Sequence, residues 1–569
     1  MSNTQATKPS VLIVGGGPVG LMTAIVLSYN GIPVRIIEKN TTNRPGQRGA
    51  GVQPRSQELY SFIGILPELQ KLSRPLMQMH LYQPSDGGAP RDAHFLTPVD
   101  PTPACPITRP LSLGQSRSEP ILRNFLLSRF GVALELATEL THFEQDAEGV
   151  SCHIVKRSVD GYKVEEDVRV LYVVGADGAR GVVRKALGLS YEGQALEQHM
   201  IIGDVRVQGL GPNPQSRWHI FGSFATQGLW LRPTEWDTPD LYQIIGSGPT
   251  VDAAGLTADY PKLAQWIREV TQLEGLTINV EWASEYRASS RMVNKFSEGR
   301  VFVAGDSAHI HPPAGAQGMN SGVQDAYNLA WKLALVLKGL SPPALLASYS
   351  DERLPVISEM IKRTTAMFNR VSKEGVDRGV NADSALYMLG INYRWSGVVV
   401  DYRGSGGEEA KGHAYLGKGD GVHAGDRAPD APGLTIAHVA PHGSLPELKA
   451  GEATSLFKFF TPAKHTALVF LPEDAERSAV GAALRSFPPG TLQTLAVLPN
   501  GVGHGPSQGS AEVDVTLVDA QGHAFSGYGS QGVGITFVIV RPDGYVGAYV
   551  RDAAGIERYC AGVFGGSAQ

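Results

Sequence analysis

Short apolar runs bounded by glycine or proline recur through the first part of the chain. The run at 11–14 leads into a glycine-rich turn and a helix start, and a second apolar run covers 33–37. A buried strand, a tight turn, a helix and another buried strand in this order are typical of a βαβ unit. Further elements of the same domain are expected from apolar runs at 151–157, 167–175 and 301–304 and from a helix at 120–130.

The hydrophobic pattern changes between residues 195 and 285. Four segments there are short, rich in aromatic and β-branched residues, and separated by glycine, proline and asparagine: 201–208, 216–223, 228–232 and 241–245. Segments of this kind predict an antiparallel sheet.

The last third of the chain begins with a helical stretch that runs from Pro355 to about 395. A polar, glycine-rich passage at 403–425 follows and is typical of a linker or surface loop. From residue 426 onward, strands are expected at 467–471, 492–498 and 535–540. Because they alternate with helical patterns, they indicate a small α/β domain.

The sequence therefore predicts an α/β protein in which a Rossmann-like domain is interleaved with an antiparallel-sheet domain. The division that we expect is 8–80, 106–190 and 286–360 for the Rossmann-like domain, 81–105 and 191–285 for the antiparallel-sheet domain, 361–425 for a helical connection and linker, and 426–569 for the C-terminal α/β domain. A chain of 569 residues exceeds what one hydrophobic core usually serves, which agrees with several domains.

The glycine-rich turn after the first strand indicates a dinucleotide site. Gly15, Gly17 and Gly20 match the G-x-G-x-x-G pattern, and Pro18 stands at the helix start. These glycines allow a tight turn, a close backbone approach to a pyrophosphate and close helix-to-strand contact. Glu38, which ends the second apolar run, is placed to accept the hydroxyls of an adenosine ribose.

A second motif, almost 300 residues later, indicates which dinucleotide is bound. Gly305 and Asp306 end an apolar strand, and the carboxylate could hold the ribityl hydroxyls of a flavin. A proline-stiffened loop then leads through Gly318, Met319 and Asn320 into a helix that we expect to begin near Ser321. Free N–H groups and the positive dipole end at a helix start suit the electron-rich pyrimidine edge of a reduced flavin ring.

With these motifs in place, the sequence resembles the class A flavoprotein aromatic hydroxylases, the family of para-hydroxybenzoate hydroxylase and phenol hydroxylase. The resemblance covers residues 8 to about 360. It rests on the two glycine motifs and on four more segments: a D-G motif at Asp177-Gly178, an R-x-x-G-x-x-x-R-x-x-E stretch with Arg48 and Arg55, Gln115 with Leu122, and Tyr349-Ser-Asp-Glu352-Arg353-Leu-Pro355. Three positions depart from the family pattern: Ala50 stands for an aspartate, Ala316 for the second glycine of the usual G-G-Q-G, and Gly181 for a serine.

The resemblance implies FAD as the cofactor of the Rossmann-like domain and NAD(P)H as a co-substrate. It also implies that the antiparallel-sheet domain, 81–105 and 191–285, binds the substrate. The arginines Arg48 and Arg55 suit flavin or nicotinamide-cofactor phosphates, because guanidinium groups bind phosphate bidentately. The residues that we expect to bind FAD are Gly15, Gly17, Pro18, Gly20, Glu38, Arg48, Arg55, Gln115, Asp177, Asp306, Gly318, Met319 and Asn320.

The implied reaction is hydroxylation of a phenolic ring with O2 through a flavin hydroperoxide. Loss of a ring carboxylate during the reaction is left open. Phenolate formation increases ring electron density, so a base, a hydrogen-bond relay or a nearby cation would help the reaction. Candidates on the expected sheet are Arg217, His219, Trp230, Arg232 and Tyr242, and Pro313 is expected beside the flavin path. Of these, we assign the catalytic role to His219, Arg217, Tyr242 and Pro313.

The amino-acid composition of the chain limits the kinds of binding partner that we expect. With 42% hydrophobic and 18% charged residues and a formal net charge of -5, the chain is globular and mildly acidic, so nucleic acid is not an expected partner. We expect no membrane span and no targeting segment, and a cytoplasmic location is the default expectation. A small aromatic molecule and O2 are the expected partners, and a homodimer is left open.

The cysteines and histidines do not indicate a metal or dithiol site. Cys105, Cys152 and Cys560 form no C-x-x-C pair, and His309 and His311 belong to the loop after the second motif. The C-terminal domain resembles the thioredoxin-like domain of phenol hydroxylase, but a single cysteine there excludes a dithiol role. Two alternatives remain for the function: a Baeyer–Villiger or epoxidising flavin monooxygenase on the same scaffold, and a non-catalytic flavin-binding protein.

Overall fold

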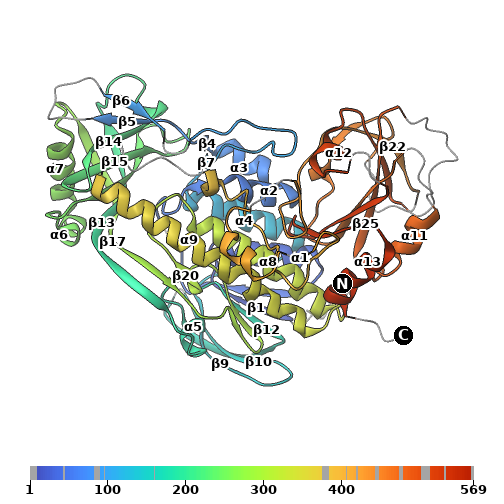
Figure 1. The fold of residues 1–569 in the computed structure, drawn as a ribbon. Coiled ribbons are helices and arrows are strands. Elements are labelled where there is room, and N and C mark those ends of the chain that lie inside the picture. Colours follow the sequence, from blue (N-terminus) through green and yellow to red (C-terminus); the bar gives the residue numbers. More distant parts are fainter. Residues whose placement is uncertain are drawn as a thin grey trace.

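The computed structural model shows five sheets and their covering helices in three lobes (Figure 1). An antiparallel sheet lies at one end, a C-terminal domain lies at the other, and the Rossmann-like part lies between them. The residues that the structure describes are 9–42, 45–82, 90–94, 97–158, 160–374, 384–404, 406–417, 421–441, 448–472, 478–501, 513–530 and 534–565.

The central lobe is built on a six-stranded sheet in the order β18-β19-β12-β1-β2-β8. All neighbouring pairs are parallel except β18 with β19. Its strands are β1 (Val11–Val14), β2 (Val34–Ile37), β8 (Leu134–Glu135), β12 (Tyr172–Gly175), β18 (Ser297–Glu298) and β19 (Val301–Val303). Every residue of β1, β12 and β19 is buried, as expected for parallel strands that are covered on both faces.

Helices α1 (Pro18–Tyr29), α4 (Gln115–Phe130) and α8 (Gly318–Leu337) cover this sheet, and α1 packs against both of the others. The smaller elements around them are α2 (Pro54–Phe62), α3 (Leu66–Leu72), α5 (Val182–Ala186) and the sheet β3 (Gly51–Val52), β7 (Leu111–Ser112) and β4 (Arg74–Pro75). A further antiparallel sheet consists of β9 (Thr138–Gln145), β10 (Val150–Arg157) and β11 (Lys163–Val170).

The second lobe is an eight-stranded sheet in the order β20-β17-β13-β16-β15-β14-β5-β6, antiparallel except where β14 pairs with β5. Its strands are β5 (Met79–Tyr82), β6 (Arg91–Ala93), β13 (Glu192–Gln208), β14 (Trp218–Ser223), β15 (Gln227–Pro233), β16 (Leu241–Ser247), β17 (Thr277–Met292) and β20 (His309–Ile310). One face is covered by α6 (Ala253–Ala258) and α7 (Tyr260–Thr271). The predicted antiparallel sheet is thus present, and β20 joins it directly to the loop after the Gly305-Asp306 motif.

The C-terminal lobe is a mixed eight-stranded sheet in the order β21-β28-β27-β24-β25-β26-β22-β23. Its elements are β21 (Val400–Asp401), β22 (Pro432–Val439), β23 (Ala453–Ser455), β24 (His465–Phe470), α11 (Ser478–Leu484), β25 (Leu492–Pro499), β26 (Val515–Asp519), α12 (His523–Gly527), β27 (Thr536–Val540), β28 (Val546–Val550) and α13 (Ala553–Phe564). Its edge strand β21 comes from the segment that we expected to be a linker. The likeness of this domain to thioredoxin stays a prediction.

A buried group of charged side chains joins the C-terminal lobe to α8 and to α9 (Ala347–Glu374). We call Glu352, Lys332, Arg541 and Asp543 the Glu352 cluster. Glu352 accepts hydrogen bonds from both terminal nitrogens of Arg541, at 2.7 and 2.9 Å, and from Lys332 Nζ at 2.7 Å. The side chains of all three are fully buried. The interface is therefore ionic as well as apolar.

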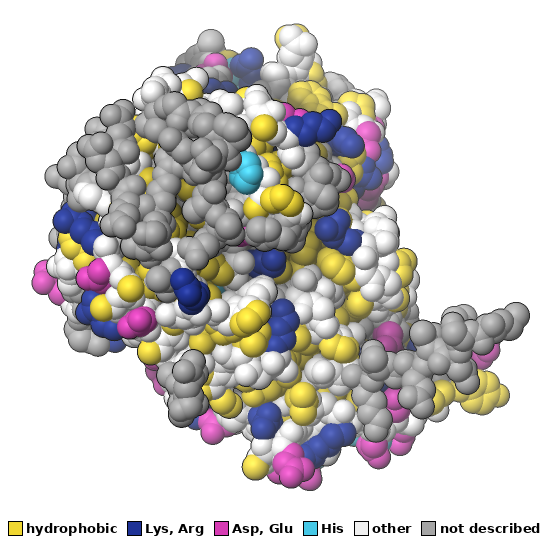
Figure 2. Space-filling model, turned by 90° about the vertical axis from the view of Figure 1, so that its right-hand side faces the viewer, with side chains coloured by type: hydrophobic (Ala, Val, Ile, Leu, Met, Phe, Trp, Pro, Cys, Tyr) yellow, Lys and Arg dark blue, Asp and Glu magenta, His cyan; other side chains and the backbone are white. Residues whose placement is uncertain are grey.

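Three helix starts differ from the sequence prediction. Helix α4 begins at Gln115 rather than at residue 120, so Pro120 lies inside it. Helix α8 begins at Gly318 rather than near Ser321, and α9 begins at Ala347, so Pro355 lies inside it. The expected helical stretch up to 395 is wrong in its last part: α9 ends at Glu374, residues 375–383 lie outside the described part, and no helix covers the described residues 388–395. None of the described helices combines the length and the apolar character that crossing a membrane requires. On the face shown in Figure 2, charged side chains of both signs are interspersed and hydrophobic ones are scattered.

Candidate active site

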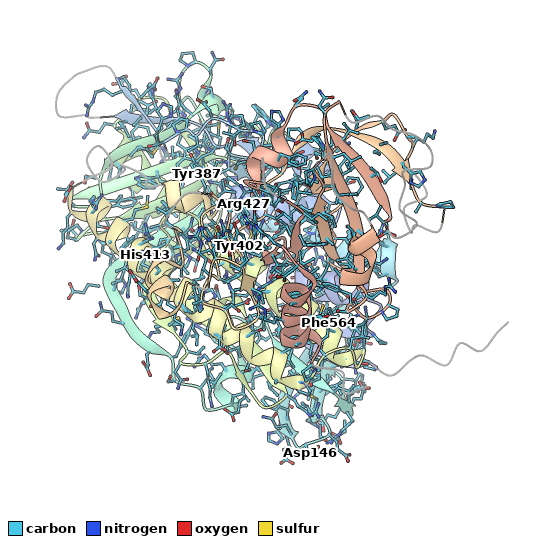
Figure 3. The ribbon with its side chains drawn as sticks, turned by 45° about the vertical axis from the view of Figure 1, so that its right-hand side comes forward. Asp146, Tyr387, Tyr402, His413, Arg427 and Phe564 are labelled. Atoms are coloured by element: carbon cyan, nitrogen blue, oxygen red, sulfur yellow. The ribbon has the colours of Figure 1, made fainter. Side chains whose placement is uncertain are left out.

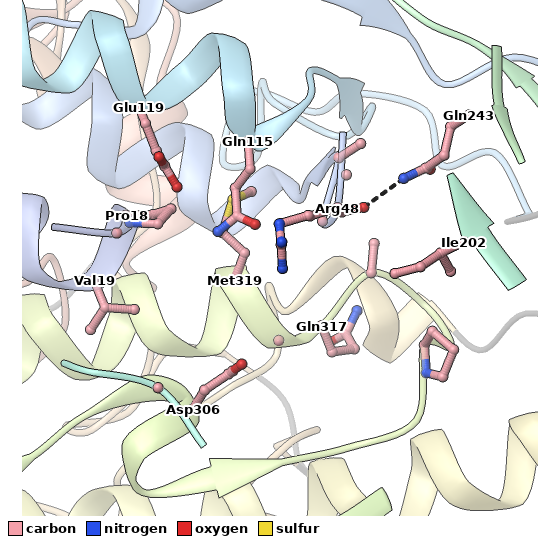
Figure 4. A pocket seen from close by; sticks show the side chains of 18 of the residues that line it. Pro18, Val19, Arg48, Gln115, Glu119, Ile202, Gln243, Asp306, Gln317 and Met319 are labelled. Carbon is pink, nitrogen blue, oxygen red and sulfur yellow. Dashed lines mark hydrogen bonds between the residues drawn. The ribbon is translucent and has the colours of Figure 1, made fainter. Parts of the chain in front are cut away.

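A cavity of about 430 Å³ lies between the Rossmann-like lobe and the face of the antiparallel sheet opposite α6 and α7. Figure 4 shows Pro18 and Val19 at one end of it and Ile202 and Gln243 at the other, with Arg48 between them. Both predicted sequence motifs and the sheet therefore contribute to one cavity, which has a cofactor end and a sheet end.

The glycine turn at the cofactor end is closely packed. Gly15 has φ +115°, and a Cβ atom there would overlap the carbonyl oxygen of Ala176. A Cβ atom at Gly20 would overlap the carbonyl oxygen of Gly15, so the first turn of α1 can approach β1 only without a side chain. Gly17 lines the cavity, and a Cβ atom there would meet no other residue. This position leaves its backbone open to a ligand.

Glu38 lies beside this turn and lines the cavity. Its Oε2 accepts the Gly16 N–H at 3.0 Å, and its Oε1 accepts the Asn40 backbone N–H at 3.0 Å. These bonds fix the carboxylate in the position expected for a ribose-binding acid.

The D-G and G-D motifs are joined by hydrogen bonds. Asp177 accepts the Ser307 hydroxyl at 2.7 Å and the Val183 N–H at 3.0 Å. A Cβ atom at Gly181 would overlap the Asp177 carboxylate, so the departure from serine at this position fits the local packing. Asp177 and Asp306 both line the cavity, and Figure 4 shows the Asp306 carboxylate pointing into it.

The start of α8 forms the next part of the wall. Gly318 and Met319 line the cavity, as predicted from the loop that precedes them. Asn320 does not line it, because its amide donates to the carbonyls of Gly51 and Ala316 at 2.7 Å each and its Oδ1 accepts the Gln53 N–H. Its place in the structure is to hold this turn together.

The structure places the two arginines proposed for phosphate binding, Arg48 and Arg55, in different surroundings. Arg48, with φ +44°, and Gln115 line the cavity. Arg55 does not, because it is fully buried, pairs with Glu58 at 2.6 Å, and donates to the Asp543 carbonyl of the C-terminal lobe. Glu119 and Arg123 also line the cavity and were not among the predicted site residues. Glu119 follows Gln115 by four residues and Arg123 follows Glu119 by four, so all three share one face of α4, and this spacing is the signal that could have found them.

The sheet end of the cavity is largely aromatic and aliphatic. Trp218, Trp230, Ile202 and Ile245 line it, together with Arg232 and Gln243. Pro313, one of the predicted catalytic residues, also lines the cavity.

The structure does not bring Arg217, His219 and Tyr242 to the cavity. Successive side chains of a strand point to opposite faces, and His219 packs against Tyr242 on the face that α6 and α7 cover. His219 Nδ1 lies 2.9 Å from the Tyr82 hydroxyl and its Nε2 lies 2.7 Å from the Pro214 carbonyl oxygen. Arg217 contacts Asp92 at the sheet edge. This placement corrects the expected position of three of the four predicted catalytic residues.

Arg232 is the charged side chain at the sheet end of the cavity, and the groups that accept its hydrogen bonds are neutral. Its Nε donates to Gln243 Oε1 at 3.0 Å, one Nη donates to Gln47 Oε1 at 3.0 Å, and the other donates to the Ser112 hydroxyl. No carboxylate of the described residues forms an ion pair with it. Burial lowers the pKa of Arg232 to about 10, so the side chain is still cationic at neutral pH.

Two buried carboxylates lie behind Arg232. Glu235 accepts the Gln47 side-chain amide at 2.8 Å, and Asp204 accepts the Gln47 backbone N–H at 3.0 Å and the Trp282 indole N–H at 2.7 Å. Gln47 therefore separates the cation from both acids. Burial raises the pKa of Asp204 to about 6.

Asp204→Asn is expected to stabilise the protein at pH 7 by about 2–3 kcal/mol. Between about pH 4 and pH 6 the folded state holds a proton on Asp204 that the unfolded state has lost, so this residue lowers stability as pH rises through that range. Denaturant unfolding at pH 4 and pH 7 measures the difference. Asp240→Asn, at a partly exposed carboxylate paired with Arg206, is the control and should give no such gain. An equal gain from both variants would contradict the assignment.

Fold and cavity together define an FAD-dependent oxidoreductase: the unobstructed backbone at Gly17, the fixed Glu38 carboxylate and the cavity-facing Asp306 fit the two ends of this cofactor. The family model described as "FAD binding domain" matches residues 8–364. The chain belongs to this FAD-binding family and is a flavoprotein monooxygenase.

The chain is similar to several known proteins over most of its length. It is 33% identical over 430 residues to a flavin-dependent monooxygenase of Mycobacteroides abscessus, covering 74% of this chain and 84% of that protein. It is 29% identical over 563 residues to pentachlorophenol 4-monooxygenase of Sphingobium chlorophenolicum, covering 97% and 95%. A solved structure of aklavinone-11 hydroxylase with FAD and aklavinone shares the fold, with a TM-score of 0.77 at 22% identity and coverage of 99% and 100%.

Proposed function

We propose that the protein is an NAD(P)H-dependent monooxygenase that hydroxylates a phenolic aromatic ring. The observation that carries this proposal is the composition of the sheet end of the cavity. Trp218 and Trp230 offer flat apolar surface, and Arg232 with Gln243 forms one polar corner. A pocket with aromatic walls and a few fixed polar groups suits an aromatic ring with one polar substituent.

Arg232 is the residue that we propose to act on the phenol. Its three hydrogen bonds hold the guanidinium in place and leave two of the five N–H groups that a guanidinium carries. A buried cation near a phenol favours the phenolate, because opposite charges attract more strongly where water is excluded. Increased electron density on the ring then favours attack by an electrophilic oxygen species.

FAD supplies the redox chemistry when it is bound, by taking a hydride from NAD(P)H and activating O2. The residues proposed to hold it are those at the cofactor end of the cavity: Gly17, Glu38, Arg48, Gln115, Asp306 and Met319. The sheet and the loop with Pro313 exclude water from the other end. Two relatives have names that agree with an aromatic substrate, pentachlorophenol 4-monooxygenase and aklavinone-11 hydroxylase.

The test is NAD(P)H and O2 consumption with a panel of phenols, hydroxybenzoates and polycyclic phenols, with product masses determined. The expected result is stimulated NAD(P)H oxidation and a product heavier by one oxygen atom, or by one oxygen with loss of a carboxylate. Ring expansion of ketones or epoxide formation without phenol turnover would identify the alternative oxygenase chemistry. Absence of any stimulation by these substrates would overturn the proposal.

Replacing Arg232 by methionine should lower kcat/KM for a phenol about 10- to 100-fold, because a hydrogen bond from a charged donor contributes about 1.5–3 kcal/mol. The spectrum of a bound nitrophenol, recorded across pH, reports its ionisation directly. Its bound pKa should rise in Arg232→Met and fall in Glu235→Gln, which removes the carboxylate behind Gln47.

Trp230→Phe is the matched control for Arg232→Met. It changes a neighbouring cavity wall on the same strand without changing charge. The bound pKa of the nitrophenol should stay at the wild-type value, even if affinity falls. Equal bound pKa values in wild type, Arg232→Met and Glu235→Gln would contradict a role of this cation in phenol activation.

A further inference from the structure

The turn before α8 is hydrogen-bonded to residues that lie outside the region matching the FAD-binding family. Gln317, which precedes the helix, is fully buried and lines the cavity. Its Nε2 donates to the Gly315 carbonyl at 2.6 Å and to the Leu386 carbonyl at 2.9 Å, and its Oε1 accepts the hydroxyl of Tyr415. Residues 386 and 415 lie beyond residue 364, where the family match ends.

The segment from 384 to 417 is itself fixed where it meets this turn. Tyr415 is fully buried, and its backbone N–H donates to Glu359 Oε2 on α9 at 3.0 Å. The preceding residues are held by Asn392, which donates from its backbone to the Ala414 carbonyl at 3.0 Å and from its side chain to the His413 carbonyl at 2.9 Å. Tyr387 and His413, labelled in Figure 3, mark the course of this segment.

A second connection runs from the same segment to the other flavin motif. The hydroxyl of Tyr393 accepts from Arg353, and Arg353 donates to Asp325 Oδ1 at 2.7 Å. Asp325 Oδ2 in turn accepts the Gly305 N–H at 3.1 Å and lies 2.7 Å from His309 Nε2. The segment is therefore connected to both ends of the loop that carries the cavity wall, directly at Gln317 and through Arg353 and Asp325 at Gly305.

We propose that Tyr415 is a positioning residue for the flavin, and that the described residues 384–404 and 406–417 support the cofactor site rather than serving only as a linker. The inference rests on the proposed function, in which FAD lies against Gly318 and Met319 at the start of α8. The Tyr415 hydroxyl fixes the Gln317 amide, and that amide fixes the turn from Gly315 to Gly318. Burial raises the pKa of the Tyr415 hydroxyl well above its ordinary value, so it stays protonated and donates at every pH where the protein is folded.

Tyr415 acts on the flavin without contacting it, because it fixes the turn that leads into α8. Helix α8 receives no side-chain cap from Gln317, so the direction of its first N–H groups depends on the turn alone. N–H groups at a helix start stabilise negative charge next to them, and the reduced flavin is the more electron-rich form. A looser turn should therefore weaken FAD binding and disfavour reduction.

The experiment compares Tyr415→Phe with the wild-type holoenzyme at full length. The FAD dissociation constant is expected to rise about three- to tenfold, the range that one hydrogen bond accounts for. The midpoint potential of bound FAD is expected to become more negative. Flavin fluorescence on dilution measures the first and an equilibrium redox titration measures the second; neither needs a substrate.

Tyr528→Phe is the matched control. This tyrosine is also buried, and its hydroxyl donates to the Pro429 carbonyl at 2.7 Å within the C-terminal lobe. It should lose a similar amount of thermal stability while the FAD dissociation constant and potential stay at wild-type values. If Tyr415→Phe behaves like Tyr528→Phe in all three measurements, the inference is overturned.

Two further variants show whether the effect passes through Gln317. In Gln317→Leu the tyrosine has lost its acceptor, so adding Tyr415→Phe should shift the potential no further, whereas additive shifts would overturn the inference.

If Tyr415→Phe fails to fold, Glu359→Gln weakens the acceptor of the Tyr415 N–H instead. It should shift the potential in the same direction by less, and an unchanged potential would count against the inference. If Tyr415→Phe shifts the FAD midpoint potential but no aromatic substrate stimulates NAD(P)H oxidation, the proposed function is overturned and the inference about Tyr415 is not.

Discussion

Glu352→Gln is expected to destabilise the protein by about 3–5 kcal/mol, because it leaves the buried cations Arg541 and Lys332 without their shared carboxylate. Burial by itself raises the pKa of Glu352, but the two cations hold it well below its ordinary value. The stabilisation is therefore complete above about pH 5 and is lost as pH falls below the ordinary glutamate pKa of about 4.3. Denaturant unfolding at pH 7 and at lower pH measures both effects.

Two comparisons make this prediction specific. Glu135→Gln removes a carboxylate that pairs with Arg35 at a partly exposed site, where an ion pair contributes about 0–1 kcal/mol. Adding Lys332→Met to Glu352→Gln should recover part of the loss, because a buried ion pair can often be replaced by apolar packing at little cost. A loss in Glu352→Gln no larger than that in Glu135→Gln would contradict the role of the cluster.

Gly15→Ala is expected to lower FAD affinity about 100-fold or more, which corresponds to about 3 kcal/mol. An alanine would have to adopt φ +115°, and its Cβ atom would overlap the Ala176 carbonyl oxygen next to the D-G motif. Either the turn or the D-G loop must then move, and both border the cavity. Flavin retained per chain after gel filtration, and reconstitution with added FAD, measure the effect.

Gly397→Ala is the control for this change. No atom lies within 4 Å of the Cβ that it would add, and Gly397 is not among the glycines with positive φ. It should retain FAD like the wild type. Full FAD retention in Gly15→Ala would mean that the glycine turn is not the dinucleotide site.

The sequence predicted the cofactor end of the cavity more accurately than the sheet end. Glycine spacing and the acids Glu38 and Asp306 are local signals, since each depends on a turn of a few residues. The sheet end depends on which face of a strand is covered, and period-two alternation cannot decide that. Tyr242 and Gln243 are adjacent in the sequence, yet α6 and α7 cover the first and the cavity exposes the second.

Long-range contacts explain the remaining differences. Arg55 was expected at a phosphate, but it is bound by Glu58 three residues later and by a carbonyl almost 500 residues away. The i, i+3 spacing of Arg55 and Glu58 was a visible signal of an ion pair on a helix. The contact with Asp543 had no such signal, and neither did the bond from Tyr415 to Gln317.

The Glu352 cluster also limits how such enzymes can be recombined. Glu352 comes from the part of the chain that matches the FAD-binding family, whereas Arg541 and Asp543 come from the C-terminal lobe. A chimera that exchanges the C-terminal lobe with that of a relative would leave Glu352 buried with only Lys332 of its two cations, unless the incoming lobe carries an arginine at the matching turn. Domain exchange within this group is therefore expected to succeed only between members that share both halves of this ion-pair network.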